Sequence, residues 1–169
     1  VADALQQVEG AFPLLFLPPN QMIAVRDPHG FRPLCMGRAD GATMFSSESP
    51  AFDLVAAEYM REVEPGEMVV VNGSGVHSYR PFAPAEPRMC IFEFVYFARP
   101  DSVMSGVSVY EARKRLGHRL AEEQPAKADI VIPVPDSGMT AALGYAERSG
   151  LPFELGLIRN HYVGRTFIE

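Results

Sequence analysis

A carboxylate, a hydroxyl and a glycine stand together where an apolar run meets a helix-like segment. Asp136, Ser137 and Gly138 follow "DIVIPVP" at 129–135 and precede Thr140. Backbone amides at a helix N-terminus, together with the helix dipole, stabilise phosphate groups. Glycine lets the backbone come close to a ligand, and a serine hydroxyl can bind an oxygen or Mg²⁺. The charge of Asp136 repels a bare anion, so the chemistry fits better if a cation or substrate hydroxyls share the site.

The same three residues also suit a purely structural role. Asp or Ser can cap a helix, and Gly is common in turns. On residue types alone this helix cap is the favoured interpretation. The chain has no GxGxxG or GxxxxGK[ST] pattern, which disfavours a dinucleotide site or a P-loop.

Three other stretches have a chemical and a plain interpretation. "YVGRTFI" combines a flexible glycine, a cation and apolar groups, which suits a lid over an anion or an ordinary surface loop. "RDPHGFRPL" reads as a hairpin turn flanked by Arg26 and Arg32. A lone cysteine such as Cys90 is most often buried packing, since a metal site needs further ligands.

The secondary structure that must position these residues differs between the first and the second half of the chain. The first eighty residues predict short strands, with one helix from about 50 to 60 capped by Ser49. A proline-rich stretch, "RPFAPAEPR", follows. Pro81, Pro84 and Pro87 have no amide hydrogen to donate in a β-sheet, so the stretch predicts a linker over 81–89. The strands are expected at 11–17, 21–26, 33–37, 43–47, 67–73 and 75–80.

After the linker, strands and helices alternate. Strands are expected at 90–98, 129–135 and 153–159, and helices from 109 to 120 and from 140 to 148. This order predicts parallel βαβ units. The first helix would bury one apolar face, made of Val109, Ala112, Leu116 and Leu120.

Composition excludes several classes of protein. The hydrophobic fraction of 47% and charged fraction of 21% are those of a globular protein. A net charge of −6 without a basic stripe argues against nucleic acid as a partner. The apolar runs are too short to span a bilayer, so no membrane partner is expected. Two cysteines, Cys35 and Cys90, fit a reducing compartment, for which we predict the cytoplasm.

The whole chain resembles the glutamine phosphoribosylpyrophosphate amidotransferases. The resemblance is carried by "AVRDPHGFRPL", "SSES", "EPGE", "CIFEFVYFARPDS", "VYEARKRLG", "VPDSG" and "NHYVGRTFI", which occur in the family's order. It implies a glutaminase of the N-terminal-nucleophile type that releases ammonia from glutamine. A type I phosphoribosyltransferase sheet would then pass this ammonia to phosphoribosyl pyrophosphate (PRPP), giving 5-phosphoribosylamine, the first step of purine biosynthesis. The fold expected is α+β followed by α/β.

The resemblance also implies roles for particular residues. "VPDSG" is similar to the pyrophosphate-binding loop, with Asp136, Ser137 and Gly138 at the ligand and Ser137 on Mg²⁺. Cys90 matches a ligand of the [4Fe–4S] cluster in one subgroup, whereas Cys35 is expected in the core. His161 stands where the family usually has arginine. The flexible loop and ammonia channel would be formed by Asn160, Tyr162, Gly164, Arg165, Thr166, Phe167 and Ile168.

The family pattern is matched only in part. The N-terminal catalytic cysteine, the acidic PRPP-binding loop and the other cluster cysteines have no counterpart here, and residue 1 is Val1. We therefore expect 1–80 to be the later part of the glutaminase domain and 90–169 the early part of the transferase domain. These 169 residues alone should be inactive. The family further implies purine nucleotide inhibitors and a homotetramer.

Two other functions stay open at this point. One is a non-catalytic module that binds a purine nucleotide or a phosphoribosyl group through "VPDSG". The other is a relative that feeds ammonia to a sugar phosphate, such as glucosamine-6-phosphate synthase. The "YVGRTFI" stretch and the βαβ second half disfavour the latter.

Overall fold

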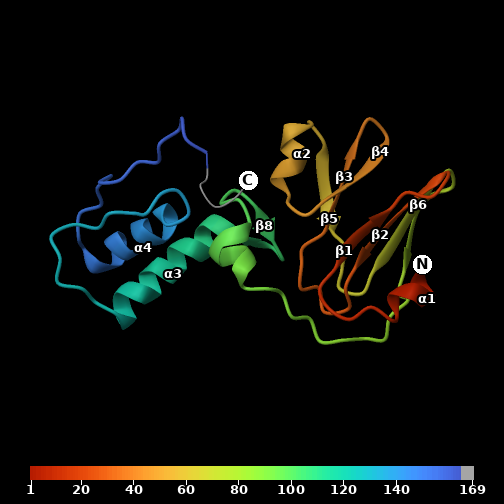
Figure 1. Ribbon diagram of the computed structural model, residues 1–169, viewed down its shortest axis with the longest axis horizontal. Coiled ribbons are helices and arrows are strands. Elements are labelled where there is room, and N and C mark those ends of the chain that lie inside the picture. The colour runs from red at the N-terminus through yellow and green to blue at the C-terminus, as the bar shows by residue number, and fades with distance from the viewer. Residues whose placement is uncertain (165–169) are drawn as a thin grey trace. The chain divides into compact units, whose positions relative to one another are not determined.

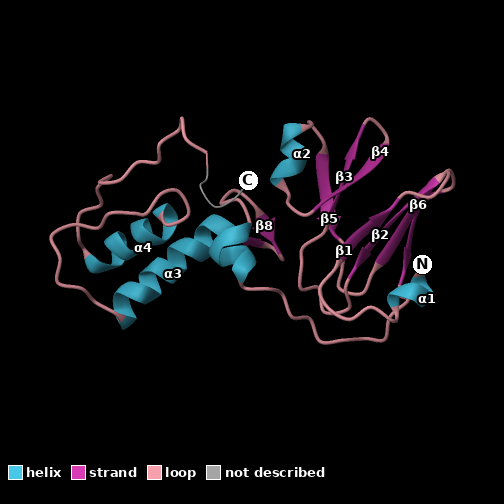
Figure 2. Ribbon diagram, viewed as in Figure 1, coloured by secondary structure: helices cyan, strands magenta, loops and turns pink. Residues whose placement is uncertain are grey.

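The computed structural model describes residues 1–164 and divides the chain into two compact units. The first unit is Val1–Val109 and the second begins at Tyr110, and each is described by itself. Figures 1 and 2 show β-strands in the first unit, and helices joined by long loops in the second. The segment 90–109 thus belongs to the compact unit of the strands, whereas the sequence placed the domain boundary at 81–89.

The first unit contains most of the regular structure. It holds two antiparallel sheets, of order β1-β2-β6-β7 and β4-β3-β5, and a small ribbon of β8 and β9. The elements are α1 (Ala2–Leu5), β1 (Pro13–Phe16), β2 (Gln21–Arg26), β3 (Cys35–Ala39), β4 (Ala42–Ser46), α2 (Pro50–Leu54), β5 (Glu58–Glu62), β6 (Met68–Asn72), β7 (Gly75–Tyr79), the π-helix η1 (Glu93–Phe97), β8 (Val103–Met104) and β9 (Val107–Ser108).

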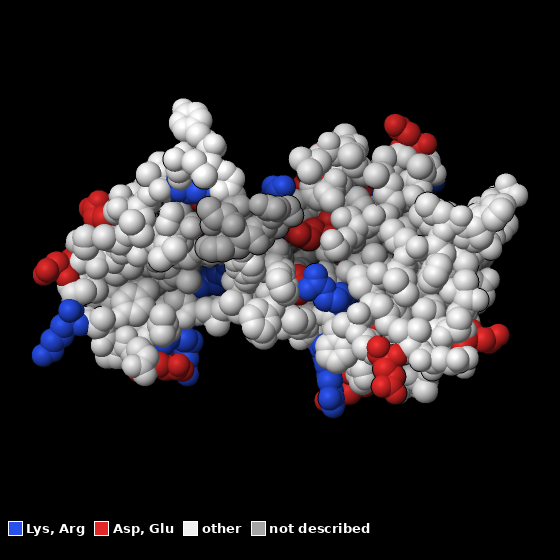
Figure 3. Space-filling model, viewed as in Figure 1, with Lys and Arg blue, Asp and Glu red and all other residues white. Residues whose placement is uncertain are grey.

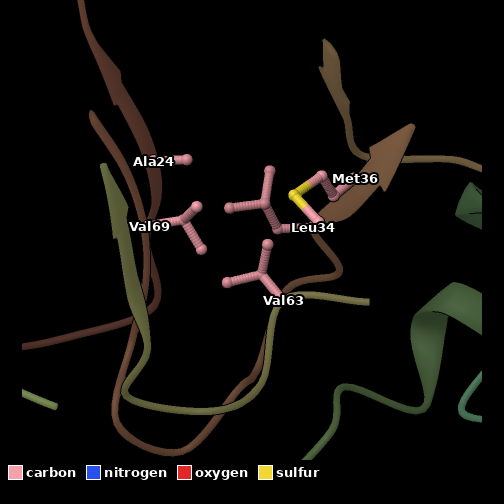
Figure 4. Packing of buried hydrophobic residues seen from close by; sticks show 5 residues of the cluster. All are labelled: Ala24, Leu34, Met36, Val63 and Val69. Carbon is pink, nitrogen blue, oxygen red and sulfur yellow. The ribbon is translucent and has the colours of Figure 1, made fainter. Parts of the chain in front are cut away.

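A hydrophobic core lies between the two sheets. In Figure 4, Ala24 and Val69 point from β2 and β6 toward side chains on the opposite side. A second cluster contains Ile23 and Val25, the sequence neighbours of Ala24. Because successive side chains of a strand point to opposite faces, both faces of the first sheet are covered. The partners of Ala24 and Val69 in the first cluster are Leu34, Met36 and Val63.

The "RDPHG" stretch forms a turn between the two sheets. The amide of Gly30 donates to the Asp27 carbonyl at 3.0 Å, and Gly30 has a φ of +63°, which suits glycine. The hairpin expected here is wrong, because β2 pairs with β1 and β6 while β3 pairs with β4 and β5. The Arg26 side chain is buried and donates to the carbonyls of Gly30, Arg32 and Val63, so it fastens the crossing between the sheets.

Two of the elements expected in this unit differ. The helix from Pro50 ends at Leu54, and Ala56 takes a φ of +51°, so the chain turns into β5. The strand expected at 90–98 is a π-helix, in which the Ala98 amide donates to the Glu93 carbonyl at 3.1 Å. Glu93 is buried and forms an ion pair with Arg32, which is distant in the sequence. Strand propensity reflects local sequence and does not predict such a contact.

The second unit packs α3 (Val109–Glu123) against α4 (Met139–Ser149). Figure 1 shows these helices side by side. The contact is close, because a Cβ added to Gly117 would lie 1.9 Å from the Ala141 carbonyl oxygen. Leu116 and Leu120, expected on the buried face of α3, are exposed instead. Small residues take the contact face because only they permit this approach of the backbones.

The parallel sheet expected in the second unit is reduced to one bridge. Val131 pairs in parallel with Phe153, the Val131 amide donating to the Pro152 carbonyl at 2.8 Å. The strands expected at 129–135 and 153–159 were therefore wrong over most of their length. Pro133 and Pro135 have no amide hydrogen to donate to a ladder. Within the described residues, no helix has the length and apolar character to cross a membrane.

Candidate functional site

The loop at 134–138 joins the single parallel bridge to the N-terminus of α4. Pro133 is fully buried, and the chain then turns so that the Gly138 amide donates to the Val134 carbonyl at 3.1 Å. The Met139 amide donates to the Asp136 carbonyl at 3.3 Å, and the Pro135–Asp136 peptide bond is cis. Two backbone hydrogen bonds thus hold the turn against the first residues of the helix.

Gly138 is required by the shape of this turn. A Cβ at position 138 would lie 2.7 Å from the Val134 carbonyl oxygen and 3.3 Å from its nitrogen. Both atoms belong to the backbone, so they cannot swing aside. Its φ of −80° is ordinary, and the requirement therefore comes from the close approach of two backbone segments.

The helix cap that residue types favoured is not formed. Gly138 is the N-cap of α4, and no side chain makes a capping hydrogen bond there. Asp136 and Ser137 are both exposed beside the first turn of the helix. The Ser137 hydroxyl therefore faces solvent at the end of the helix whose dipole favours an anion. This arrangement meets the geometric requirement of a phosphate-binding loop.

Arg159 brings a cation to the same loop. Its Nη1 lies 3.4 Å from the Asp136 Oδ2, and both side chains are more than half exposed. The guanidinium offsets part of the carboxylate charge that would repel a phosphate. Sequence reasoning missed Arg159. The signal was available, because 129–135 and 153–159 were expected as parallel strands whose carboxyl ends meet at one sheet edge.

The residues expected to form a lid are described only in part. Asn160, Tyr162 and Gly164 are exposed, and the Tyr162 side chain is 99% exposed. The Tyr162 amide donates to the Asn160 side-chain oxygen at 3.0 Å. Only two residues lie between Arg159 and Tyr162, so this segment starts beside the Asp136 loop. The remaining residues assigned to the lid lie outside the described residues: Arg165, Thr166, Phe167 and Ile168.

The loop fits a magnesium ion that is brought by its ligand. Among the described residues, no three His, Cys, Asp or Glu side chains stand close enough to hold a metal ion by themselves. Mg²⁺ does not need such a cage, since it keeps several waters and is held by one or two protein oxygens with substrate phosphates. Ser137 and Asp136 offer exposed oxygens of this kind.

The two cysteines differ in their surroundings. Cys35 lies in β3 and is 1% exposed, and burial, followed by the nearby Glu62 carboxylate, raises its pKa from 9.0 to about 12. It is a protonated core thiol, as expected from the sequence. Cys90 is half-buried, and its amide donates to the Phe31 carbonyl at 3.0 Å. A [4Fe–4S] cluster takes four thiolates, so these two residues by themselves do not fit one.

Charged side chains are dispersed on the visible surface. Figure 3 shows acidic and basic atoms in separate small groups rather than in one basic stripe on the described residues of this face. A continuous run of Lys and Arg would be expected for binding a nucleic acid backbone.

The chain is similar over its whole length to curated proteins of one kind. It is 54% identical to the chloroplastic amidophosphoribosyltransferase of Glycine max and 52% identical to the amidophosphoribosyltransferase of Rhizobium etli. These alignments cover 100% and 99% of this chain, but 30% and 35% of the relatives. The chain therefore spans about a third of the length of these relatives. No protein-family model matches it.

Solved structures agree with the sequence comparison. The glutamine PRPP amidotransferase of B. subtilis complexed with ADP and GMP matches with a TM-score of 0.93 and 48% identity. The match covers 99% of this chain and 37% of that one. A structure described as the allosteric regulatory enzyme of purine biosynthesis matches with the same TM-score and identity, and is covered to 36%.

Proposed function

The chain is homologous along its whole length to amidophosphoribosyltransferases, and we propose that it is the middle part of such an enzyme. In this proposal the enzyme releases ammonia from glutamine and transfers it to PRPP, giving 5-phosphoribosylamine, pyrophosphate and glutamate. Residues 1–80, which hold both sheets, are the later part of the glutaminase domain, and residues 90–169, which include α3 and α4, are the early part of the transferase domain.

The loop at 134–138 is the proposed site for the pyrophosphate group of PRPP. The observation that carries this assignment is the exposed Ser137 at the start of α4, on a turn that Gly138 holds against Val134. The amides of Gly138 and Met139 already donate within the turn, so the donors left for phosphate oxygens are the following amides of the first helical turn, which have no carbonyl partner within the helix. The ligand's charge would be met by these donors, by Ser137 and by Arg159, which lies at the same loop.

The proposal includes two cofactors, Mg²⁺ at the loop and a [4Fe–4S] cluster at Cys90. When bound, Mg²⁺ would neutralise charge on the pyrophosphate, and Ser137 with Asp136 would supply its protein oxygens. The ion would also offset the repulsion between the Asp136 carboxylate and the phosphate groups. The [4Fe–4S] cluster stays a prediction that depends on Cys90 alone.

The lid and the wider biology also stay predictions. Tyr162 and Gly164 belong to the segment that would fold over PRPP and complete a water-excluding path for ammonia. Purine nucleotides are proposed inhibitors, in keeping with the B. subtilis relative that was solved with ADP and GMP. A homotetramer is expected, and the cytoplasm remains the predicted compartment, although relatives include chloroplastic proteins.

Calorimetry on the full-length enzyme tests the site. We expect Gly138→Ala to weaken the binding of PRPP with Mg²⁺ at least about tenfold, because the added methyl group pushes the loop away from Val134. Ser137→Ala should weaken binding less, by the loss of one hydroxyl contact of about 1 kcal/mol.

Gly73→Ala is the matched control for this experiment. Position 73 has no atom within 4 Å of an added Cβ, so the variant should bind PRPP as the wild type does. Unchanged PRPP affinity in Gly138→Ala, with the fold intact by circular dichroism, would remove the loop from the site. Binding of AMP or GMP without PRPP would instead indicate a nucleotide-binding module.

A further inference from the structure

The segment 99–105 leads from the first unit toward α3, and side chains of the sheet region hold it in place. It follows the π-helix η1, contains most of "ARPDS" and ends in the ribbon of β8 and β9. Its backbone contacts are local: the Ser102 amide donates to the Arg99 carbonyl at 3.0 Å, and Val103 and Met104 pair with Ser108 and Val107 in the ribbon. Its position on the first unit therefore depends on contacts with residues far away in the sequence.

Three side chains make these contacts, two from the connection between β4 and β5 and one from the end of β5. The Glu48 Oε2 accepts hydrogen bonds from the Arg99 amide at 2.8 Å and from the Ser102 hydroxyl at 3.1 Å. The Ser49 hydroxyl oxygen accepts one from the Val103 amide at 3.1 Å. The Glu62 Oε1 accepts one from the Ser105 amide. We call Glu48, Ser49 and Glu62 the clip.

The clip explains what "SSES" does in this fold. Ser49 was expected to cap α2, but it makes no capping hydrogen bond there and its hydroxyl meets Val103 instead. Glu48 and Glu62 are only partly buried, so their carboxylates bind backbone amides without a full desolvation cost. Hydrogen bonds of this kind, with an ionised acceptor, are stronger than neutral ones.

The held segment leads directly into the helix that begins the second unit. The Ser102 carbonyl accepts a hydrogen bond from the Val109 amide at 3.0 Å, and Val109 is the first residue of α3. Ser102 and Val109 are both fully buried. Glu48 thus acts through Ser102 on Val109, the residue at which the first unit ends and α3 begins.

We propose that the clip couples the two half-reactions, with Glu48 as its main positioning residue. This inference rests on the proposed function, in which ammonia made in the glutaminase domain is used in the transferase domain. Ammonia escapes to water unless the step that releases it is coordinated with the step that uses it. Side chains of 48–62 hold the segment 99–105, so a change at either end of these contacts is passed to the other, whereas a loose segment would allow each site to work without the other.

The test compares two nitrogen donors in the full-length enzyme. Glu48→Ala removes both hydrogen bonds of Glu48, and we expect the ratio of glutamine-dependent to ammonia-dependent phosphoribosylamine formation to fall about fivefold or more. Ammonia-dependent activity should stay within about twofold of wild type, since a coupling contact acts on transfer rather than on the PRPP site. Glutamate release per phosphoribosylamine should rise correspondingly.

Hydrogen exchange gives a readout that does not depend on activity. The Arg99 amide should exchange about tenfold faster in Glu48→Ala, and the Val103 amide about tenfold faster in Ser49→Ala, because each loses its side-chain acceptor. Glu48→Gln keeps an oxygen acceptor of the same size and should restore most of the coupling. Glu58→Ala removes an exposed carboxylate from β5 and should change neither readout.

The outcomes separate this inference from the proposed function. A wild-type enzyme that forms no phosphoribosylamine from either donor would disprove the function, and the coupling with it. An active wild type whose two donor activities fall equally in Glu48→Ala, or do not change, would disprove the coupling alone. Unchanged exchange of the Arg99 amide in Glu48→Ala would show that the clip does not hold the segment.

Discussion

At the scale of single residues, the buried carboxylate of Glu67 stabilises the fold through its hydrogen bonds. It is 2% exposed, and its oxygens accept hydrogen bonds of 2.7–2.8 Å from Arg61, the Glu64 amide and Ser78. Burial alone would raise the pKa of Glu67, but these donors outweigh it and lower the pKa from 4.5 to about 2. The last residue of "EPGE" thus ties β5, β6 and β7 together.

This lowered pKa predicts how stability depends on pH. Because the folded pKa lies below the unfolded one, the contribution of Glu67 is fully present above pH 4.5 and is lost as the pH falls toward about 2. We expect Glu67→Gln to lower the free energy of unfolding by about 2 kcal/mol at pH 7, from lost charged hydrogen bonds. Urea unfolding at several pH values measures this difference, which should shrink below pH 4.5.

Glu64→Gln is the control for that experiment. Glu64 belongs to the same turn, and its carboxylate forms an ion pair with Arg80 in which both side chains are more than half exposed. Exposed pairs contribute at most about 1 kcal/mol. A Glu67→Gln variant with the stability of Glu64→Gln at neutral pH would contradict the role assigned to Glu67.

At the scale of elements, the crossing of α3 and α4 fixes where the candidate site lies. Gly117 and Gly144 are buried where the two helices meet, and a Cβ at position 144 would lie 2.1 Å from the Lys114 carbonyl oxygen. The loop at 134–138 ends at the first turn of α4, so its position follows from this contact. Gly117 and Gly144 therefore help to set the position of the loop at 134–138 through the packing of α3 against α4.

Gly144→Ala should destabilise the second unit despite a favourable change in helix propensity. Alanine in a helix interior normally gains about 1 kcal/mol over glycine. Here the methyl group meets backbone, and overpacking of this kind costs about 1–3 kcal/mol. We expect a lower thermal midpoint in circular dichroism, with Gly73→Ala unchanged. A higher midpoint would mean that the helices lie farther apart than described.

Some elements were predictable and others were not, for identifiable reasons. The run "QMIAVR" between two turn sequences predicted 21–26 with the bounds of β2, because local sequence is enough to decide that strand. The π-helix at 93–97 depends on Glu93 pairing with Arg32, which is distant in the sequence. At the site, residue types favoured a helix cap for Asp136 and Ser137 and the family resemblance placed them at a ligand; the structure shows both exposed without a capping hydrogen bond. Arg159 was missed, because its approach to Asp136 follows from chain pairing rather than from residue type.

At the scale of the whole molecule, the chain carries two parts of different completeness. The first unit has two sheets with hydrophobic clusters on both faces of one of them. Over its described residues, 110–164, the second has two helices and a single parallel bridge, and it leaves Ile132, Val134 and Leu157 exposed. The chain spans about a third of its relatives, so we expect further strands to cover these side chains in the full-length enzyme.

The last prediction concerns the glutaminase reaction of these 169 residues by themselves. Releasing ammonia from glutamine by the family's route needs an accessible thiolate. The chain has two thiols: Cys35 is buried, and its pKa of about 12 keeps it protonated at neutral pH, while Cys90 lies after the Pro-rich segment and three residues before η1 begins. We therefore expect no glutamate release above the buffer rate from the isolated chain, measured beside the full-length enzyme as a positive control. Glutamate release that disappears in Cys90→Ser would assign the nucleophile to Cys90 and would overturn the division of the chain that we propose.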